Sequence, residues 1–494
     1  VWSGRFGAWD EVMPPRTAPG PSNPAQIVDW RRFSSDALLA CFEAERAILA
    51  RLTPALPVTT NFMLLNDRLD HRRWGRRLGL VSVDLYPDPA TEEASEVESA
   101  LTQDLMRSLG DGRPWLLLEQ APSAVNWRPL NVPKRPGLMR ALSLGAVGRG
   151  ADGILFFQWR GARGGAEMFH STLLPVGGTG TRGWRRTVEL GRDLARLAEV
   201  AGSRVEAETA LILDWEAWWA LEQGGHPTSG LRYRDEAIGW YGPLHRAGVA
   251  VDVRGPDEPL DRYRLVVAPN LFMLDPAAAD ALARYVEAGG ILLLGTASGL
   301  VDRAYHVPGG HHPALLRELA GIRWEETWPI LGPGPIDGPG GASLAFDAAA
   351  VPGAGPVAAT IQREALELAG ATAVARHVGG ELDGWPAVTR RAVGAGEVWY
   401  VGTAPDPAGR ERLIAALGAR AGVAPVAPVP PGVRVARRVG EDASFLVYVN
   451  HAPDRRVVVA PGAGLDLLTG RPIAADEALS LEPLDAVVLR LARG

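Results

Sequence analysis

The sequence predicts an α/β protein in three parts: one half of a (β/α)8 TIM barrel, a second α/β domain, and a small antiparallel β-sandwich. Four short apolar runs within the first 160 residues are separated by segments long enough for helices. Such a β-then-α repeat implies parallel strands with right-handed crossovers. Beyond a proline-rich stretch at 425–431, short alternating or apolar runs follow one another, a pattern typical of antiparallel strands.

Length and composition restrict the class of protein. The 494 residues are 47% hydrophobic and 22% charged, which suits two to four ordinary globular domains. A net charge of -6 gives no electrostatic reason to bind nucleic acid or an anionic membrane surface. The sequence shows no run of about 18 apolar residues and no signal-peptide pattern, so we expect a cytoplasmic protein without a membrane segment.

Cys41 is the only cysteine. A single cysteine excludes an internal disulfide and a cysteine-based zinc site within these residues. Because it lies among Leu38, Leu39 and Phe42, we predict that it is a buried apolar side chain.

The first part is assigned to residues 1–202. Residues 1–34 show little periodicity and predict an ordered loop, whereas apolar spacing predicts a helix from 34 or 35 to about 52. The four strand-like runs lie at 58–63, 80–86, 115–119 and 153–159, and helices are predicted at 101–109, 137–148 and 185–201. Each run is short, flanked by breakers and rich in large apolar side chains, as expected of a strand buried on both faces.

Four such units cannot close an eight-stranded barrel, which typically takes about 250 residues. We therefore expect only half of a barrel, with unpaired edge strands. The chain also starts Val1-Trp2-Ser3, without a methionine. This start predicts a processed or truncated N-terminus.

The second and third parts are assigned to residues 203–422 and 430–494. In the second part, strands are predicted at 208–214, 262–269, 289–294 and 398–402, with helices at 275–288 and from 402 to about 420. The glycine-containing run that begins at Gly295 lacks both the dinucleotide fingerprint and a P-loop lysine, so we interpret it as an ordinary turn. In the third part, strand runs at 444–449, 456–460, 465–468, 479–481 and 486–491 predict the sandwich.

Several polar residues follow the predicted barrel strands. Glu119 ends the third run, and the C-terminal ends of barrel strands form the catalytic rim. From the residues alone, this carboxylate fits a catalytic role or a structural ion pair equally well. Trp127 fits a ring that stacks on a ligand or a core side chain. Glu167 and His170, in a glycine-rich loop, fit hydrogen-bonding groups of a ligand site, a solvated loop or, for His170, a structural histidine.

Five blocks of sequence resemble glycoside hydrolase family 42 β-galactosidases. The segment LEQAPSAVNW at 118–127 resembles the nucleophile region of that family, and FFQWR…RGGAEMFH at 156–170 resembles a further block. Blocks at 9–16, 57–63 and 214–219 are also similar. The resemblance covers the whole chain and is densest over 1–220, and several long blocks in one order are a specific signal.

The resemblance implies retaining hydrolysis of terminal β-D-galactosides by two carboxyl groups, which must lie about 5–5.5 Å apart. It implies that the four predicted strands are strands 5–8 of the barrel. It also implies that Glu119 is the nucleophile and that Tyr86, Trp127, Glu167 and His170 bind the substrate. The match at Tyr86 is softer, because Val83 stands where the family usually has tryptophan. No cofactor and no metal are expected, and the substrate is a small β-galactoside or oligosaccharide.

The resemblance also implies that 203–422 is a flavodoxin-like domain through which a homotrimer assembles. Four tryptophans near its start fit an aromatic interface or the core of the domain equally well: Trp215, Trp218, Trp219 and Trp240.

One departure from the family is plain. The family's general acid/base is a glutamate in an Asn-Glu pair, expected before Trp9, and the sequence contains no such pair. The family's cysteine zinc site, when present, belongs to that same missing part. We therefore expect the acid/base to lie in a missing N-terminal part and this fragment alone to be inactive. The alternatives are a related glycosidase acting on another β-linked sugar or an α-arabinoside, and a non-catalytic carbohydrate-binding remnant.

Overall fold

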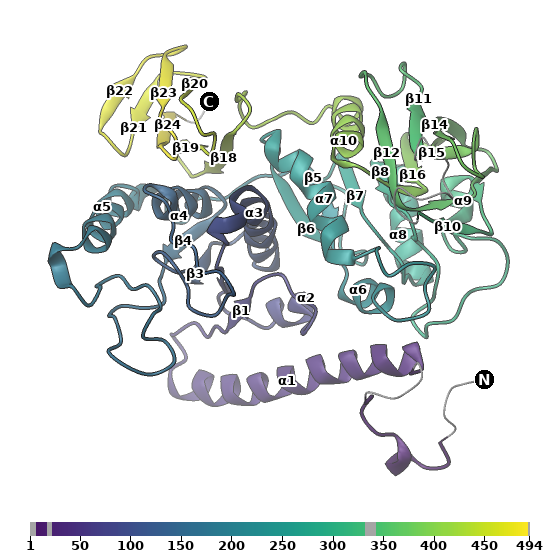
Figure 1. Ribbon diagram of the computed structural model, residues 1–494, viewed down its shortest axis with the longest axis horizontal. Helices are drawn as coiled ribbons and strands as arrows, with labels where there is room; N and C mark the ends of the chain where they lie inside the picture. The colour runs from purple at the N-terminus through teal and green to yellow at the C-terminus, as the bar shows by residue number, and fades with distance from the viewer. Residues whose placement is uncertain (1–5, 17–21, 331–341, 493–494) are drawn as a thin grey trace.

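The computed structural model describes residues 6–16, 22–330 and 342–492 (Figure 1). The first part contains a four-stranded sheet in the order β1-β2-β3-β4, parallel throughout. Its strands are β1 (Asn61–Met63), β2 (Ser82–Asp84), β3 (Trp115–Glu119) and β4 (Ala151–Ile154). The four predicted strands and their parallel order are confirmed. Among the described residues the sheet is open, with β1 and β4 at its edges.

The fourth strand is shorter than predicted. Regular pairing ends at Ile154, although the Leu155 amide still donates to the Leu117 carbonyl at 2.8 Å and the Phe157 amide donates to the Gln120 carbonyl at 3.1 Å. The apolar run therefore continues past the strand as an irregular segment that still lies along β3.

Helices cover this sheet and border it: α1 (Pro24–Leu52), α2 (His71–Gly75), α3 (Glu92–Leu109), α4 (Leu138–Gly148) and α5 (Arg182–Arg196), with short 3-10 turns at Trp9–Glu11, Pro89–Thr91, Gly178–Gly180 and Ala198–Val200. The predicted loop over 1–34 is wrong from Pro24 onward. Asn23 Oδ1 accepts the Ala25 amide at 3.0 Å and Pro24 occupies the first turn, so both N-terminal signals of a helix are present.

Helix α1 lies along one edge of the molecule (Figure 1) and contacts α6 through an ion pair between Arg32 and Glu216. The side chains of Leu38, Ile48 and Cys41 are exposed on it. The prediction that Cys41 is buried is wrong, because it lies on the outer face of α1, whereas Leu39 and Phe42 pack against the core.

The second part is one mixed sheet whose parallel centre has the order β16-β8-β7-β5-β6. The parallel strands are β5 (Thr209–Ile212), β6 (Val251–Arg254), β7 (Leu265–Ala268), β8 (Ile291–Leu294) and β16 (Gly396–Val401). Antiparallel strands extend it beyond β16: β10 (Thr327–Pro329), β11 (Ser343–Phe346), β12 (Val357–Glu364), β14 (Thr372–Val378), β15 (Pro386–Val393) and β17 (Thr403–Pro405). A separate pair joins β9 (Ile322–Arg323) to β13 (Glu367–Leu368). The helices are α6 (Trp215–Leu221), α7 (Tyr233–Arg246), α8 (Pro276–Glu287), α9 (Arg317–Ala320) and α10 (Pro407–Ala421).

The four tryptophans near the start of this part are buried within the chain, and Trp215 and Trp240 are almost fully so. They form core together with α6, α7 and the central strands. Their burial supports the core interpretation over an aromatic interface.

The turn that begins at Gly295 encloses a carboxyl group of its own chain. Glu364 accepts hydrogen bonds from the Thr296 hydroxyl at 2.8 Å and the Ala297 amide at 2.7 Å, and its other oxygen accepts from the Tyr400 hydroxyl at 2.8 Å. Because Glu364 occupies the donors that a phosphate would need, the interpretation as an ordinary turn is confirmed.

The third part is antiparallel throughout, as predicted. Five strands form one sheet, β18 (Val433–Val439), β19 (Ala443–Asn450), β24 (Ala486–Ala492), β21 (Gly464–Asp466) and β22 (Arg471–Ile473), and β20 (Arg456–Val459) pairs with β23 (Ala478–Leu481). Apolar side chains of both sheets enclose a core. The prediction missed β18 and β22.

Buried charged side chains join the three parts. Glu96 of α3 lies 2.6 Å from His245 Nε2 of α7 and accepts from Arg434 Nε of β18 at 3.2 Å. The guanidinium of Arg438, also on β18, is fully buried and donates to the Asp152 carboxylate and the Ser203 carbonyl, both at 2.7 Å. A buried charge that loses its partner is strongly destabilising, so these contacts hold the parts in one arrangement.

Within the described ranges, none of the helices combines the length and the apolarity that crossing a membrane would require.

Candidate active site

Glu119 is the last residue of β3, and its half-buried carboxylate reaches the carboxyl end of the parallel sheet. The Tyr86 hydroxyl donates a hydrogen bond to Glu119 Oε2. No arginine, lysine or histidine forms an ion pair with Glu119 within the described residues. The alternative that Glu119 belongs to a structural ion pair is therefore not supported by its surroundings.

Three aromatic rings gather beside this carboxylate. Trp127 and His170 are stacked with their centroids 5.2 Å apart, and Tyr86 meets Trp127 edge-on at 4.8 Å. Trp127 is 54% exposed whereas His170 is buried. The core interpretation of Trp127 is wrong, and its ring offers an apolar face of the kind that packs on a sugar ring.

Glu167 lies in the loop that follows β4, with an exposed side chain. The His170 amide donates to the Glu167 carbonyl at 3.0 Å, and the Asn126 side chain donates to the Ala166 carbonyl at 2.6 Å. These bonds tie the loop to the segment after β3. Burial raises the pKa of Tyr86, and the negative charges of Glu119 and, more weakly, Glu167 raise it further. All five predicted residues thus lie around the ends of β2, β3 and β4.

A second carboxyl group at this edge was missed. Asp84, the last residue of β2, is the register partner of Glu119 and is buried. Its Oδ2 accepts from Asn61 Nδ2 at 2.6 Å, and its Oδ1 is buried with no hydrogen-bond partner. Burial, with a smaller contribution from the charge of Glu119, raises the pKa of Asp84 to about 6. Side chains alternate between the two faces of a strand, so Asp84 and Tyr86 share one face. Its spacing from Tyr86 is the sequence signal that could have identified Asp84.

Lys134 lies beneath the segment after β3. Its ammonium group is buried and donates to the Ala121 carbonyl at 2.5 Å and to Gln120 Oε1 at 3.3 Å. Burial, with help from the charge of Arg128, lowers the pKa of Lys134 to about 7. Nothing in the sequence patterns singled out this residue.

Among the described residues, no group of three or more histidine, cysteine, aspartate or glutamate side chains is placed to hold a metal ion. The candidate site therefore consists of side chains that can attack, hydrogen-bond and stack.

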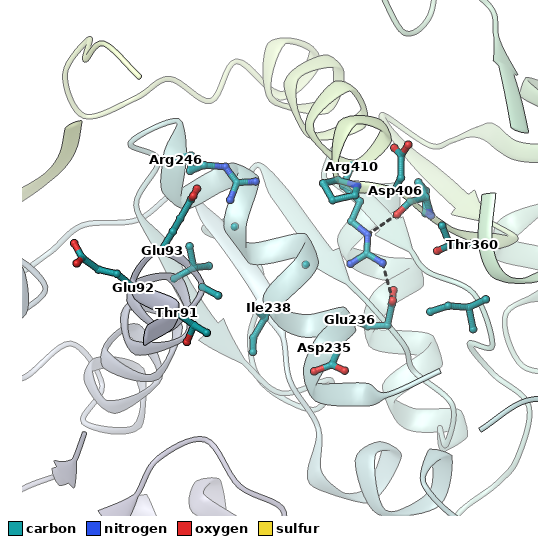
Figure 2. Close-up of a pocket in the computed structure, with 17 residues that line it drawn as sticks. Thr91, Glu92, Glu93, Asp235, Glu236, Ile238, Arg246, Thr360, Asp406 and Arg410 are labelled. Carbon is teal, nitrogen blue, oxygen red and sulfur yellow. Dashed lines mark hydrogen bonds and ion pairs between the residues drawn. The ribbon is translucent and has the colours of Figure 1, made fainter. Parts of the chain in front are cut away.

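A hollow of about 730 Å³ lies away from Glu119, between α3, α7 and α10 (Figure 2). Its Arg410 donates to Glu236 at 2.6 Å and to the Pro405 carbonyl at 2.9 Å. Figure 2 shows these groups directed at each other across the junction of α7 and α10. Its central charges are thus satisfied by the protein itself.

Comparisons with known proteins agree with this fold. Three family models match in succession: the β-galactosidase model of glycoside hydrolase family 42 over residues 1–197, the β-galactosidase trimerisation domain over 207–424, and the β-galactosidase C-terminal domain over 432–491. A β-galactosidase from Arthrobacter sp. is 40% identical and covers 95% of this chain. The β-galactosidase bgaB from Geobacillus kaustophilus is 37% identical and covers 99%.

A solved β-galactosidase from Bacillus circulans sp. alkalophilus superposes with a TM-score of 0.92 at 34% identity, over 98% of this chain and 72% of that one. The fold and these matches together define the class of protein: an α/β glycoside hydrolase with a TIM-barrel domain and a C-terminal β domain. The chain belongs to the family 42 β-galactosidases. It spans 65% of the length of the Arthrobacter relative and 71% of the Geobacillus relative.

Proposed function

We propose that the chain carries the nucleophile of a retaining β-galactosidase and that this nucleophile is Glu119. The observation that supports this most directly is a carboxylate at the end of a parallel barrel strand that receives a tyrosine hydroxyl and no cation. One oxygen is oriented by Tyr86, and the other is available to attack the anomeric carbon. Attack would break the glycosidic bond, release the aglycone with a proton from the general acid, and form a galactosyl ester, which water then hydrolyses with net retention.

In this proposal the other predicted residues hold the sugar. The exposed Trp127 ring packs against the apolar face of galactose. Glu167 and the free Nε2 of His170 hydrogen-bond its hydroxyl groups, since His170 Nδ1 already lies 2.7 Å from the Ser171 carbonyl.

A retaining mechanism needs a second carboxyl group as acid and base. We propose that it is the glutamate of an Asn-Glu pair on another strand of the barrel, a pair that the 494 residues do not contain. Asp84 is an unsuitable substitute, because its carboxyl is buried beneath the sheet edge and bonded to Asn61. Its place beside Glu119 suits it to tune the nucleophile.

We further propose a division into a catalytic part at 1–202, a trimerisation domain at 203–422 and a small β-sandwich at 430–494, with assembly as a homotrimer. Support comes from the match of the trimerisation-domain model to residues 207–424. Light scattering after size exclusion should give three times the mass of one chain.

The nucleophile can be tested without the acid. A 2,4-dinitrophenyl 2-deoxy-2-fluoro-β-galactoside has a leaving group that departs without protonation, and the fluorine slows hydrolysis of the ester. We expect a mass increase of one fluorogalactosyl group, located by peptide mass spectrometry on Glu119. Labelling of another residue, or none at millimolar reagent, would reject the assignment. The matching glucoside and arabinoside reagents test the choice of sugar.

A further inference from the structure

A second hollow, of about 680 Å³, is lined by His170, whose ring stacks on Trp127, but not by Trp127 itself. It is bounded by the segment after β3, the loop after β4 and the first turn of α5. His170 therefore forms a wall shared by this hollow, which we call the basic hollow, and the candidate sugar site.

The charges that line the basic hollow are all of one sign. Lys134, Arg135, Arg182 and Arg186 contribute to its lining, and the described residues that line it include no aspartate or glutamate. Arg135 is neutralised by a bidentate ion pair with Glu92. Arg182 and Arg186 form no ion pair or side-chain hydrogen bond in the described part of the chain.

Arg182 and Arg186 are held on one face of α5. They are four residues apart, and side chains at that spacing lie on one face of a helix. The helix begins at Arg182, with Thr181 Oγ1 accepting from the Trp184 amide. Its first turn adds the positive end of the helix dipole at the rim of the hollow. The site is thus electropositive from two independent sources.

Apart from His170, whose Nε2 the proposed function assigns to the sugar, one buried group in the wall has hydrogen-bonding capacity to spare. The buried Lys134 ammonium uses two of its three N–H groups on Ala121 and Gln120. Ser171 and Thr172 add hydroxyl groups to the lining. Buried polar groups are normally satisfied, so these positions indicate a ligand.

We propose that the basic hollow is a subsite for an oxyanion substituent, a sulfate, phosphate or carboxylate group, carried by the saccharide whose galactosyl ring lies on Trp127. The proposal rests on the proposed function and extends it to acidic galactosides. Arginine pairs such oxyanions in bidentate geometry, and the shared His170 wall places the charged substituent next to the ring that carries it.

The test compares methyl β-D-galactoside with its 3-, 4- and 6-sulfates, by isothermal titration of the full chain at 0.15 M salt. We expect at least one sulfate to bind about tenfold or more tightly than the neutral sugar, as expected for one or two charge-assisted hydrogen bonds. This preference should disappear in R182Q/R186Q. It should persist in R185Q/R192Q, which removes the same charge from α5 at positions outside the hollow.

Every other outcome of this titration also decides for or against the subsite. Equal affinity for the neutral and all sulfated sugars would overturn the subsite while leaving the galactose site standing. Arginine-dependent binding of inorganic sulfate, without any preference for sulfated sugar, would overturn it in favour of a free-anion site. Failure of every sugar to bind would overturn both the subsite and the proposed function. Binding of a sulfated sugar alone, lost in R182Q/R186Q, would support the subsite and count against neutral galactosides.

Discussion

Glu119 and Glu364 are both glutamates at the ends of β-strands, yet their surroundings differ in kind. Glu364 is fully buried and accepts three hydrogen bonds from Thr296, Ala297 and Tyr400. Glu119 is half-buried and accepts one side-chain bond, from Tyr86. A carboxyl group whose acceptors are filled contributes to the fold, whereas one with spare acceptor capacity at an open sheet edge is available for chemistry. Burial alone would have selected the wrong glutamate.

The largest expected effect is on Glu119. E119Q should reduce labelling by the dinitrophenyl fluorogalactoside at least about 10⁴-fold, the order of loss seen when a nucleophile is removed. The melting temperature should stay within a degree or two, because Glu119 has no ion pair to lose. Mass spectrometry and calorimetry on one sample measure both. A large fall in melting temperature would mean that Glu119 is structural after all.

E364A should show the opposite pattern. It leaves three buried donors without an acceptor and creates a cavity, so we expect a loss of roughly 3 kcal/mol or more in the free energy of unfolding. Urea denaturation measures it, and E364Q, which retains an acceptor and the volume, is the matched control. The labelling rate of the folded variant should match the parent. A labelling defect at full stability would remove the distinction between the two glutamates.

Y86F tests how Glu119 is held. The variant deletes one hydroxyl donor to a carboxylate, and we expect labelling to slow by about 10- to 100-fold. Phenylalanine keeps the ring that meets Trp127 edge-on, so the variant removes the hydroxyl alone. An unchanged labelling rate would indicate that Tyr86 serves only to pack Trp127.

D84N should give the smallest effect, visible chiefly against pH. Its folded-state pKa of about 6 lies above the ordinary aspartate pKa of 3.8. A raised carboxyl pKa means that the stability contribution is present below about pH 4 and is lost as pH rises to about 6. The difference in melting temperature between D84N and the parent should therefore change across this window and level off above it. A constant difference would show that Asp84 does not titrate there.

The elements that could be predicted from the sequence are those whose residues follow a single local pattern, such as an unbroken apolar run. The runs at 115–119 and 291–294 are apolar on both faces, so they could be recognised as buried parallel strands. Strand β14 carries Arg376 and His377 among its apolar residues, and its mixed pattern hid it. The start of α1 was also readable, from Asn23 and Pro24, but the absence of apolar periodicity in the first residues outweighed those signals.

The candidate site divides in the same way. Glu119, Trp127, Glu167 and His170 were found because they lie in blocks that resemble a known family, and Tyr86 was found through a softer match outside those blocks. Asp84, two residues before Tyr86, became notable only when the structure paired it with Glu119 and left one oxygen without a partner. Lys134 and the arginines of α5 converge from segments distant in sequence, so no local pattern could have joined them.

The buried Arg438 of β18 has a consequence for how such chains can change in evolution. Its partners are Asp152, in the first part of the molecule, and Ser203, at the start of the second. A recombination event that exchanged the C-terminal sandwich would have to bring in a cation at the same position. Otherwise Asp152 would be left in the interface without that cation. The three parts are consecutive in sequence, but their boundaries are not free points of exchange.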